Sequence, residues 1–258
     1  MASQPDPEIV LYDLACTKSV CFSPVVWRIR LLLNYKQIAY ETIFLEFPDI
    51  EPTLKALPDA RPSRIKSPFS GPDFFSSGID SQSKYTVPAI HHVPSNTYMM
   101  DSTPIAQFIE ATYPEPPVPL TSELGREIEA KARAVVGTTF RNSVMPREIN
   151  ILSPRSQEYF RRTREAILGH RLEDLLSQEE NSWNSLADGI RAVGELMRTN
   201  KVDGPFVLGA RPSYTDFFIA GSLQCVRMVD EGVFQKNITY PGYQEIYEAC
   251  LPYMDKKD

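Results

Sequence analysis

A cluster of prolines divides this chain into two parts. In the segment 114–119, Pro-Glu-Pro-Pro-Val-Pro, four of the six residues are proline. Proline lacks the backbone N–H and fixes φ, so this segment can continue neither a helix nor a central strand. The chain has 258 residues, which is enough for two modest domains. We therefore predict one domain over residues 1–113, a stiff linker over 114–121 and a second domain over 122–258.

The first part alternates between strand-like and helix-like segments. Apolar, β-branched and aromatic residues favour strands at 9–12, 40–47, 89–93 and 97–100. Apolar residues spaced three to four apart favour helices at 24–35 and 103–112. This order predicts a small mixed sheet covered by helices.

The second part has helical apolar spacing throughout. Three apolar stripes begin at Leu124, Phe160 and Trp183. A further helix is expected to begin near Ser213, because Asp216 three residues later completes a motif like a capping box. The second domain is therefore predicted to be all-helical, and Asp216 is assigned a role in folding rather than in chemistry.

The first predicted helix begins at a serine. Ser23 is a good N-cap residue, and Pro24 suits the first helical position, where its missing N–H costs nothing. A helix N-terminus presents unpaired N–H groups and the positive end of the helix dipole, and these can hold an anion such as a thiolate. On the residues alone, both simple capping and a catalytic role are open for Ser23.

Two later segments could bind an extended peptide-like ligand. Pro88 precedes a predicted strand, and a cis bond there would turn the backbone N–H and C=O of Val87 outward. Asp101 and Ser102 precede a predicted helix, where a carboxylate and a hydroxyl can hold amino and carboxylate groups. The sequence does not fix the isomer at Pro88, and plain helix capping is the alternative for the second pair.

These segments, in this order, resemble the glutathione transferase superfamily. The resemblance is carried by residues 9–12, 23–30, 87–90, 101–110 and 212–217. Within the superfamily, the chain is most similar to the serine-type enzymes of fungi related to bacterial β-etherases, through segments 22–28, 33–36 and 47–52. The resemblance implies a thioredoxin-like α/β N-terminal domain, an all-α C-terminal domain, glutathione as co-substrate and a homodimer.

The resemblance also implies a role for each site residue. Ser23 would donate a hydrogen bond to the glutathione thiolate, Val87 beside a cis Pro88 would pair with the cysteinyl backbone, and Asp101 and Ser102 would hold the γ-glutamyl group. Lowering the pKa of a thiol by about two units requires about 2.7 kcal/mol. One charge-assisted hydrogen bond together with the helix N-terminus is of that size, and a solvent-exposed site is expected to limit the effect of that bond.

One segment departs from the family pattern. Residues 58–85 are rich in Pro, Ser and Gly and stand where the family usually has a short second helix, which often supplies a ligand for a glutathione carboxylate. The candidates for that contact are Lys66, Lys84 and Tyr85. The segment also carries Phe69, Phe74 and Phe75, and it could cover the site, alter dimer packing or be an inert surface loop.

The second substrate is expected to bind between the domains, where clefts generally form. By family geometry, one wall is the loop 15–22 and the other is the helix that contains residue 140. The candidate lining residues are Phe22, Phe140, Arg141, Val144 and Met145. Apolar side chains with one arginine suit a small hydrophobic or aromatic molecule that carries a polar or acidic group.

Three alternatives differ from this hypothesis. Cys21 lies in the same loop and could support thiol transfer, although Ser23 holds the aligned place and the Cys16/Cys21 spacing is not C-x-x-C. A ligandin would hold aromatic compounds with little turnover. A non-catalytic scaffold would keep glutathione binding and lose the chemistry, because a fold does not fix a function.

Composition argues against several other classes. The net charge of -6 disfavours nucleic-acid binding, and the three histidines show no metal-ligand spacing, so no metal site is expected. The chain has no apolar stretch that approaches the length of a membrane span. Four scattered cysteines and the lack of a hydrophobic leader favour a cytoplasmic location.

Overall fold

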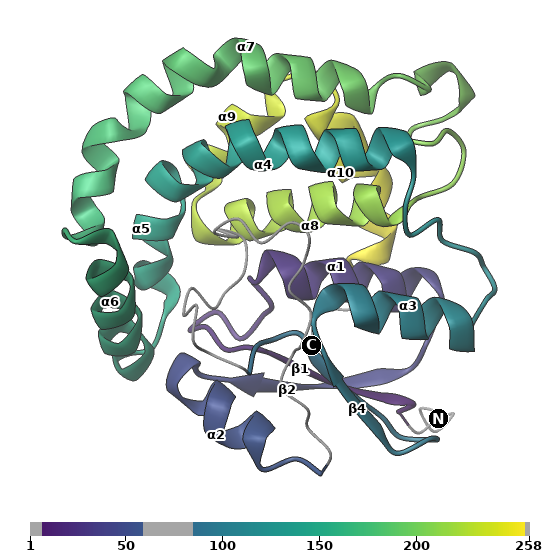
Figure 1. The fold of residues 1–258 in the computed structure, drawn as a ribbon. Helices are drawn as coiled ribbons and strands as arrows, with labels where there is room; N and C mark the ends of the chain where they lie inside the picture. The colour runs from purple at the N-terminus through teal and green to yellow at the C-terminus, as the bar shows by residue number, and fades with distance from the viewer. Residues whose placement is uncertain (1–6, 59–84, 256–258) are drawn as a thin grey trace.

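The first part of the chain forms a four-stranded mixed sheet (Figure 1). The computed structural model describes residues 7–58 and 85–255. The strands are β1 (Ile9–Leu14), β2 (Tyr40–Leu45), β3 (Ala89–His92) and β4 (Thr97–Met100), in the order β2-β1-β3-β4. β1 is parallel to β2 and antiparallel to β3, and β3 is antiparallel to β4. The predicted mixed sheet is therefore present.

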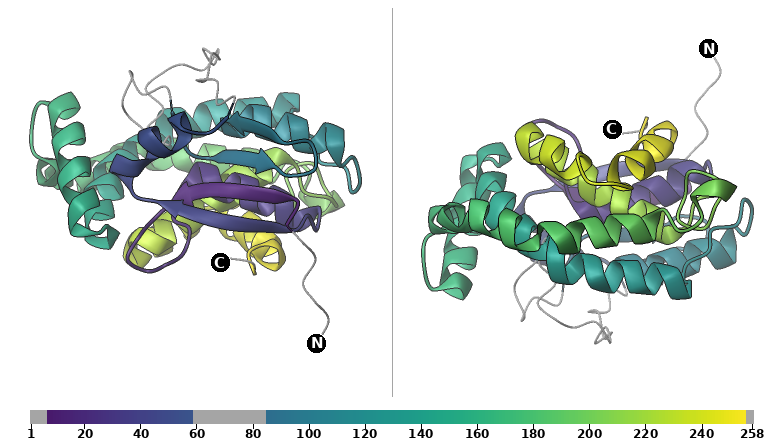
Figure 2. Two further views of the ribbon diagram at one scale, coloured as in Figure 1. Left: turned by 90° about the horizontal axis from the view of Figure 1, so that it is seen from below. Right: turned by 90° about the horizontal axis from the view of Figure 1, so that it is seen from above.

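Helices cover both faces of this sheet (Figures 1 and 2). α1 (Pro24–Tyr35) and α3 (Ser102–Thr112) lie between the sheet and the helical part of the chain. On the other face, a 3₁₀ turn (Phe47–Asp49) leads into the short helix α2 (Ile50–Lys55).

Helix α2 corrects one expectation. The sequence pattern predicts no helix at 50–55, and the family resemblance puts segment 58–85 in the place of the second helix, but α2 comes before that segment. The helix has six residues, including Pro52, so its periodicity was too short to detect. Of the segment 58–85, residues 59–84 lie outside the described part of the chain.

The second part of the chain is helical, as expected. Its helices are α4 (Glu123–Ser143), α5 (Met145–Glu148), α6 (Pro154–Leu168), α7 (Glu179–Met197), α8 (Tyr214–Val229), α9 (Glu231–Ile238) and α10 (Tyr243–Cys250). Short 3₁₀ turns lie at Ile149–Ile151, Leu172–Gln178, Lys201–Asp203 and Leu251–Tyr253. α8 is buried along most of its length and packs against α1, α4, α9 and α10 (Figure 1). The predicted architecture, an α/β domain followed by an all-α domain, is confirmed.

A buried lysine fixes the proline-rich segment against the first domain. The Lys36 ammonium donates to the carbonyl oxygens of Tyr113 at 2.7 Å and Pro116 at 2.8 Å, and it pairs with Glu110 at 2.8 Å. The other carboxylate oxygen of Glu110 accepts a hydrogen bond from the Val118 N–H at 3.1 Å. The segment between α3 and α4 is thus held by hydrogen bonds as well as by the stiffness of its prolines.

The start of α8 is organised by one buried carboxylate. Asp216 accepts hydrogen bonds from the Ser213 N–H at 2.7 Å, from the Ser213 hydroxyl at 2.6 Å and from the Val207 N–H at 2.8 Å. The carboxylate therefore accepts hydrogen bonds from the N-cap residue of the helix and from the loop that precedes it. This arrangement is the folding role that the sequence pattern predicts for Asp216.

We predict that Asp216→Ala lowers the free energy of unfolding by about 3 kcal/mol, because it leaves two buried N–H donors without an acceptor. For a chain of this size, that corresponds to a melting temperature about 8 °C lower. Thermal denaturation followed by circular dichroism measures the change. Asp188→Ala, at an exposed position of α7, is the matched control. Equal melting temperatures for the two variants would contradict the assignment.

Candidate functional site

The direction of the strands brings the predicted site residues to one edge of the sheet. β1 and β4 are both antiparallel to β3, so they run in the same direction and end at the edge where β3 begins. α1 follows β1 and α3 follows β4, and both helices therefore begin near this edge (Figure 1). Ser23, the pair Val87–Pro88 and the pair Asp101–Ser102 all lie along it. In open sheets, ligands commonly bind at the carboxyl ends of strands.

Ser23 occupies the N-cap position of α1 without using its hydroxyl as a cap. Its backbone is extended, with φ −67° and ψ 123°, and its carbonyl oxygen accepts the first helical hydrogen bond from the Trp27 N–H at 2.9 Å. Its side chain makes no capping hydrogen bond to the helix. The expected solvent-exposed site is not present at this residue, because Ser23 is fully buried. A ligand thiol therefore reaches this hydroxyl only after the atoms that cover it move aside.

The loop that leads to Ser23 is anchored by the tryptophan of the same motif. The Trp27 indole N–H donates to the carbonyl oxygen of Cys21 at 3.0 Å. The Cys21 thiol lies 3.7 Å from the carbonyl oxygen of Ser23, within the range for a hydrogen bond from sulfur. Both side chains are buried, so the backbone around Ser23 is fixed from the first turn of α1.

Cys21 is placed poorly for nucleophilic chemistry. Burial raises the pKa of its thiol well above the ordinary value, and the nearby Asp13 carboxylate raises it further. A cysteine nucleophile needs the opposite environment, one that favours the thiolate. The structure therefore weighs against the thiol-transfer alternative.

A buried ion pair behind the Ser23 loop escaped the sequence analysis. Asp13 of β1 and Arg30 of α1 pair at 2.9 Å, and both side chains are fully buried. Arg30 also donates to the Thr42 hydroxyl of β2 at 2.9 Å. A sequence signal exists, because Asp13 and Arg30 are charged residues within mainly apolar segments. Buried charges are almost always paired, so two such residues in adjacent elements predict each other.

The two segments expected to hold the backbone of glutathione lie side by side. The Val87–Pro88 peptide bond is cis, and the side chain of Val87 is buried. The Asp101 N–H donates to the Pro88 carbonyl oxygen at 3.2 Å, and the Thr86 hydroxyl donates to the Asp101 carboxylate at 3.3 Å. Two hydrogen bonds therefore join residues 86–88 to Asp101, at the place where β3 begins and β4 ends.

Asp101 has an unusual backbone conformation. Its φ of 72° and ψ of 133° lie in a region that residues other than glycine rarely adopt. Its carboxylate makes no capping hydrogen bond to α3, so capping does not explain the residue type. Such strain costs about 1–3 kcal/mol and is concentrated at ligand-binding positions. The conformation favours a binding role for this side chain.

The expected second-substrate pocket lies largely within the core. Phe22, Phe140, Val144 and Met145 are buried, and Arg141 is partly exposed. Their assignment as a pocket for a hydrophobic molecule stays a prediction. Of the candidates for a glutathione carboxylate contact, Tyr85 is partly exposed, whereas Lys66 and Lys84 lie outside the described residues.

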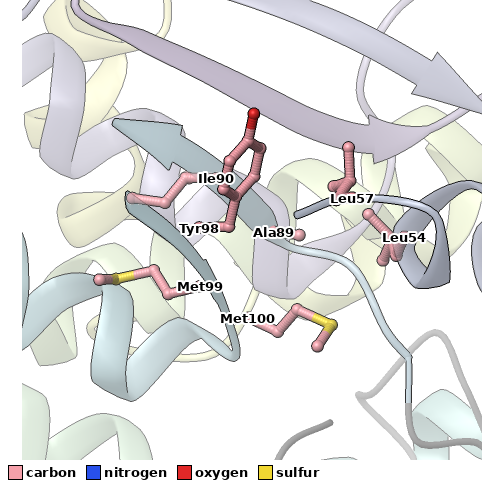
Figure 3. Close-up of a pocket in the computed structure, with 7 residues that line it drawn as sticks. All are labelled: Leu54, Leu57, Ala89, Ile90, Tyr98, Met99 and Met100. Atoms are coloured by element: carbon pink, nitrogen blue, oxygen red, sulfur yellow. The ribbon is translucent and has the colours of Figure 1, made fainter. Parts of the chain in front are cut away.

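Two hollows in the described structure do not fit the predicted ligands. An apolar cavity of about 10 Å³, room for one water-sized sphere, lies between α2 and the β3–β4 hairpin (Figure 3). Its lining residues are Leu54, Leu57, Ala89, Ile90, Tyr98, Met99 and Met100. A groove of about 500 Å³ between α7 and α10 carries Glu195 and Glu245, which pair with Arg198 at 3.3 and 3.5 Å. The first is a packing gap and the second is lined by charges that already have partners.

Comparison with known sequences identifies the family. The N-terminal domain model of glutathione S-transferases matches residues 22–112, and the C-terminal domain model matches residues 128–238. The glutathione S-transferase-like protein ustS of Aspergillus flavus is 32% identical over 239 residues, which cover 85% of this chain and 80% of that protein. The chain belongs to the glutathione S-transferase family. The resemblance inferred from the motifs is confirmed at this level.

Solved structures of fungal glutathione transferases have the same fold. Glutathione transferase GSTFuA3 from Phanerochaete chrysosporium gives a TM-score of 0.78 at 28% identity, over 96% of this chain and 97% of that one. The glutathione S-transferase CsGST63524 of Ceriporiopsis subvermispora, solved in complex with glutathione, gives 0.77 at 27% identity, over 95% and 97%.

Residues 7–58 and 85–255 contain no group of three or more His, Cys, Asp or Glu side chains placed to hold a metal ion. None of the helices in these two ranges combines the length and the apolar composition needed to span a bilayer.

The raised pKa of the Glu148 carboxyl predicts a pH-dependent stability. Burial raises the pKa of its carboxyl to about 7, and the Arg164 guanidinium opposes part of that shift. The folded state therefore favours protonated Glu148, whereas the unfolded chain ionises near pH 4.5. The stabilising contribution is complete below pH 4.5 and is lost as the pH rises through 7.

We predict that the unfolding free energy of wild type falls by about 2 kcal/mol between pH 5 and pH 8 as Glu148 ionises. Glu148→Gln should not show this fall. Urea denaturation at the two pH values measures this difference for each protein. Glu158→Gln, at an exposed position of α6, should keep the wild-type dependence. The same pH dependence in wild type and Glu148→Gln would show that Glu148 does not titrate in this range.

Proposed function

We propose that this chain is a serine-type glutathione transferase that uses glutathione as co-substrate. The observation that carries the proposal is the convergence of Ser23, Val87–Pro88 and Asp101–Ser102 at one sheet edge. Support comes from family membership and from a structural relative at 27% identity that was solved with glutathione bound. In this proposal the second substrate is a small hydrophobic or aromatic electrophile, and the enzyme works as a cytoplasmic homodimer.

Each part of glutathione then has a partner in the site. Asp101 and Ser102 receive the γ-glutamyl group, since the carboxylate can pair with its ammonium and the start of α3 can hold its carboxylate. The backbone of Val87 pairs with the cysteinyl residue in the manner of an added strand. These contacts direct the cysteinyl sulfur toward the start of α1.

The chemistry depends on stabilising the thiolate at the start of α1. The thiol releases its proton to solvent, and the Ser23 hydroxyl donates a hydrogen bond to the anion while the helix N-terminus adds its dipole. The sulfur lone pair forms a C–S bond with the electrophile. The displaced electron pair leaves with the departing group or takes up a proton from water. Ser23 is fully buried in this structure, so in this proposal the atoms that cover its hydroxyl move aside when glutathione binds.

We expect Ser23→Ala to lower turnover about 100-fold while the dissociation constant for glutathione changes less than three-fold. Removing one buried, preorganised donor to a developing anion costs on this scale. Steady-state kinetics with a chromogenic electrophile, together with calorimetric titration of glutathione, separate the two effects.

Cys21→Ser is the matched control for this test, because it changes a neighbouring residue of the same loop. On the serine hypothesis it keeps most of the turnover. Undiminished turnover in Ser23→Ala would sink the assignment of Ser23, and complete loss in Cys21→Ser would favour thiol transfer.

Two substitutions test the role of Asp101 in glutathione binding. Asp101→Ala and Asp101→Gly should each weaken glutathione binding at least ten-fold, because both remove the carboxylate that would pair with the γ-glutamyl ammonium. Asp101→Gly should also raise the free energy of unfolding by about 1 kcal/mol, since glycine accepts the positive φ. Calorimetry and urea denaturation measure the two quantities. Wild-type affinity in either variant would remove Asp101 from the binding site.

A further inference from the structure

Helix α8 contacts the first turns of both helices that carry the proposed glutathione site. α8 belongs to the helical domain, whereas α1 and α3 belong to the α/β domain (Figure 1). Its contact with α1 centres on Gly221, and its contact with α3 is made by Tyr214. The two residues are seven positions apart, which is about two helical turns or 10.5 Å along one face.

At Gly221 the backbones of α8 and α1 meet without an intervening side chain. A Cβ atom there would lie 3.0 Å from the Cβ of Trp27, 3.1 Å from the carbonyl oxygen of Pro24 and 3.2 Å from the backbone nitrogen of Arg28. At these distances a side chain fits only if the first turn of α1 gives way by a few tenths of an ångström. Gly221 therefore fixes the start of α1, the turn that follows Ser23, against α8.

At the other end, Tyr214 joins α8 to the start of α3. Its phenol O–H donates a hydrogen bond to the backbone carbonyl oxygen of Ser102 at 2.8 Å, across 112 residues of sequence. The side chain is buried, so this bond is not in competition with bulk water. Ser102 is one of the two residues proposed to hold the γ-glutamyl group.

The ring of Tyr214 is itself held in place by charged residues. The Arg28 guanidinium lies 3.7 Å from the centre of the ring, in a cation–π arrangement. Arg28 pairs with Glu129 of α4 at 2.8 Å, and the same carboxylate oxygen accepts a hydrogen bond from the Thr215 hydroxyl at 3.0 Å. The phenol is thus positioned from α1, α4 and α8 together, and its donor has a fixed direction.

We infer that Tyr214 is a positioning residue for glutathione: it holds the first turn of α3 so that Asp101 and Ser102 bind the γ-glutamyl group while the thiol lies at Ser23. This inference rests on the proposed function. Tyr214 contacts the α3 side of the site and leaves the start of α1 fixed by Gly221. Its removal should therefore weaken binding of glutathione and leave thiol activation unchanged.

The test compares Tyr214→Phe with Tyr243→Phe. Both remove a buried phenol hydroxyl that reaches a backbone carbonyl oxygen, but Tyr243 reaches Ile190 within the helical domain, at 3.4 Å. Calorimetric titration with glutathione should show a dissociation constant about five-fold higher for Tyr214→Phe, the cost of one hydrogen bond. Tyr243→Phe should stay within two-fold of wild type. The pKa of the bound thiol, from thiolate absorbance, should be the same in all three proteins.

The possible results separate the proposed function from the positioning role of Tyr214. No glutathione binding by wild type would defeat the proposed function itself. Wild-type binding with an unchanged dissociation constant in Tyr214→Phe would overturn the positioning role alone. A shifted thiol pKa in Tyr214→Phe would overturn it too, because it would mean a general disturbance of the site.

If Tyr214→Phe does not fold, Glu129→Gln provides the same test. It weakens the ion pair that holds Arg28 against the ring of Tyr214. It should raise the dissociation constant at least two-fold with the thiol pKa unchanged. Wild-type affinity in this variant would count against the inference.

Discussion

Buried contacts hold helix α1 against the sheet on one side and against α8 on the other. The relative position of the two domains depends on these contacts. On the sheet side, the Asp13–Arg30 ion pair joins β1 to α1 in a fully buried setting. On the helical side, the glycine of α8 lets the two helix backbones touch. Breaking a buried pair leaves an uncompensated charge, which costs about 3–5 kcal/mol, so the position of α1 is strongly determined. The start of this helix is where the proposed chemistry takes place.

Elements with a clear local pattern could be predicted from the sequence. The predicted bounds of the helix at 24–35 and the strand at 97–100 agree with α1 and β4, and the hydrogen bonds expected of Asp216 are present. Helix α2 was missed because six residues with a proline show too little periodicity. The motifs placed Ser23, Val87–Pro88 and Asp101–Ser102 at the beginnings of α1, β3 and α3, where the structure has them.

Long-range contacts account for what the sequence could not reveal. The burial of Ser23 and the hydrogen bond from Tyr214 to Ser102 depend on segments that lie far apart in the chain. The backbone conformation of Asp101 is imposed by its surroundings against the preference of its residue type. Tyr214 is an example. The capping motif around it predicts the role of Asp216, but it does not predict that the Tyr214 phenol contacts the other domain.

The serine and cysteine hypotheses differ in the local environment of the two side chains. Cys21 is buried beside a carboxylate, and both features raise the pKa of its thiol. Ser23 stands two residues later at a helix N-terminus, where partial positive charge favours an anion. The helix N-terminus at Ser23 and the raised thiol pKa of Cys21 both support the proposed serine mechanism over the cysteine alternative.

The most direct test is an ultraviolet titration of thiolate absorbance for glutathione bound to wild type and to Ser23→Ala. A free thiol ionises near pH 8.5. We predict that wild type holds the bound thiol as a thiolate at neutral pH, with an apparent pKa about two units lower. Ser23→Ala should move that pKa back up by at least one unit. Bound glutathione that remains a thiol at neutral pH in wild type, or an identical pKa in the two proteins, would contradict it.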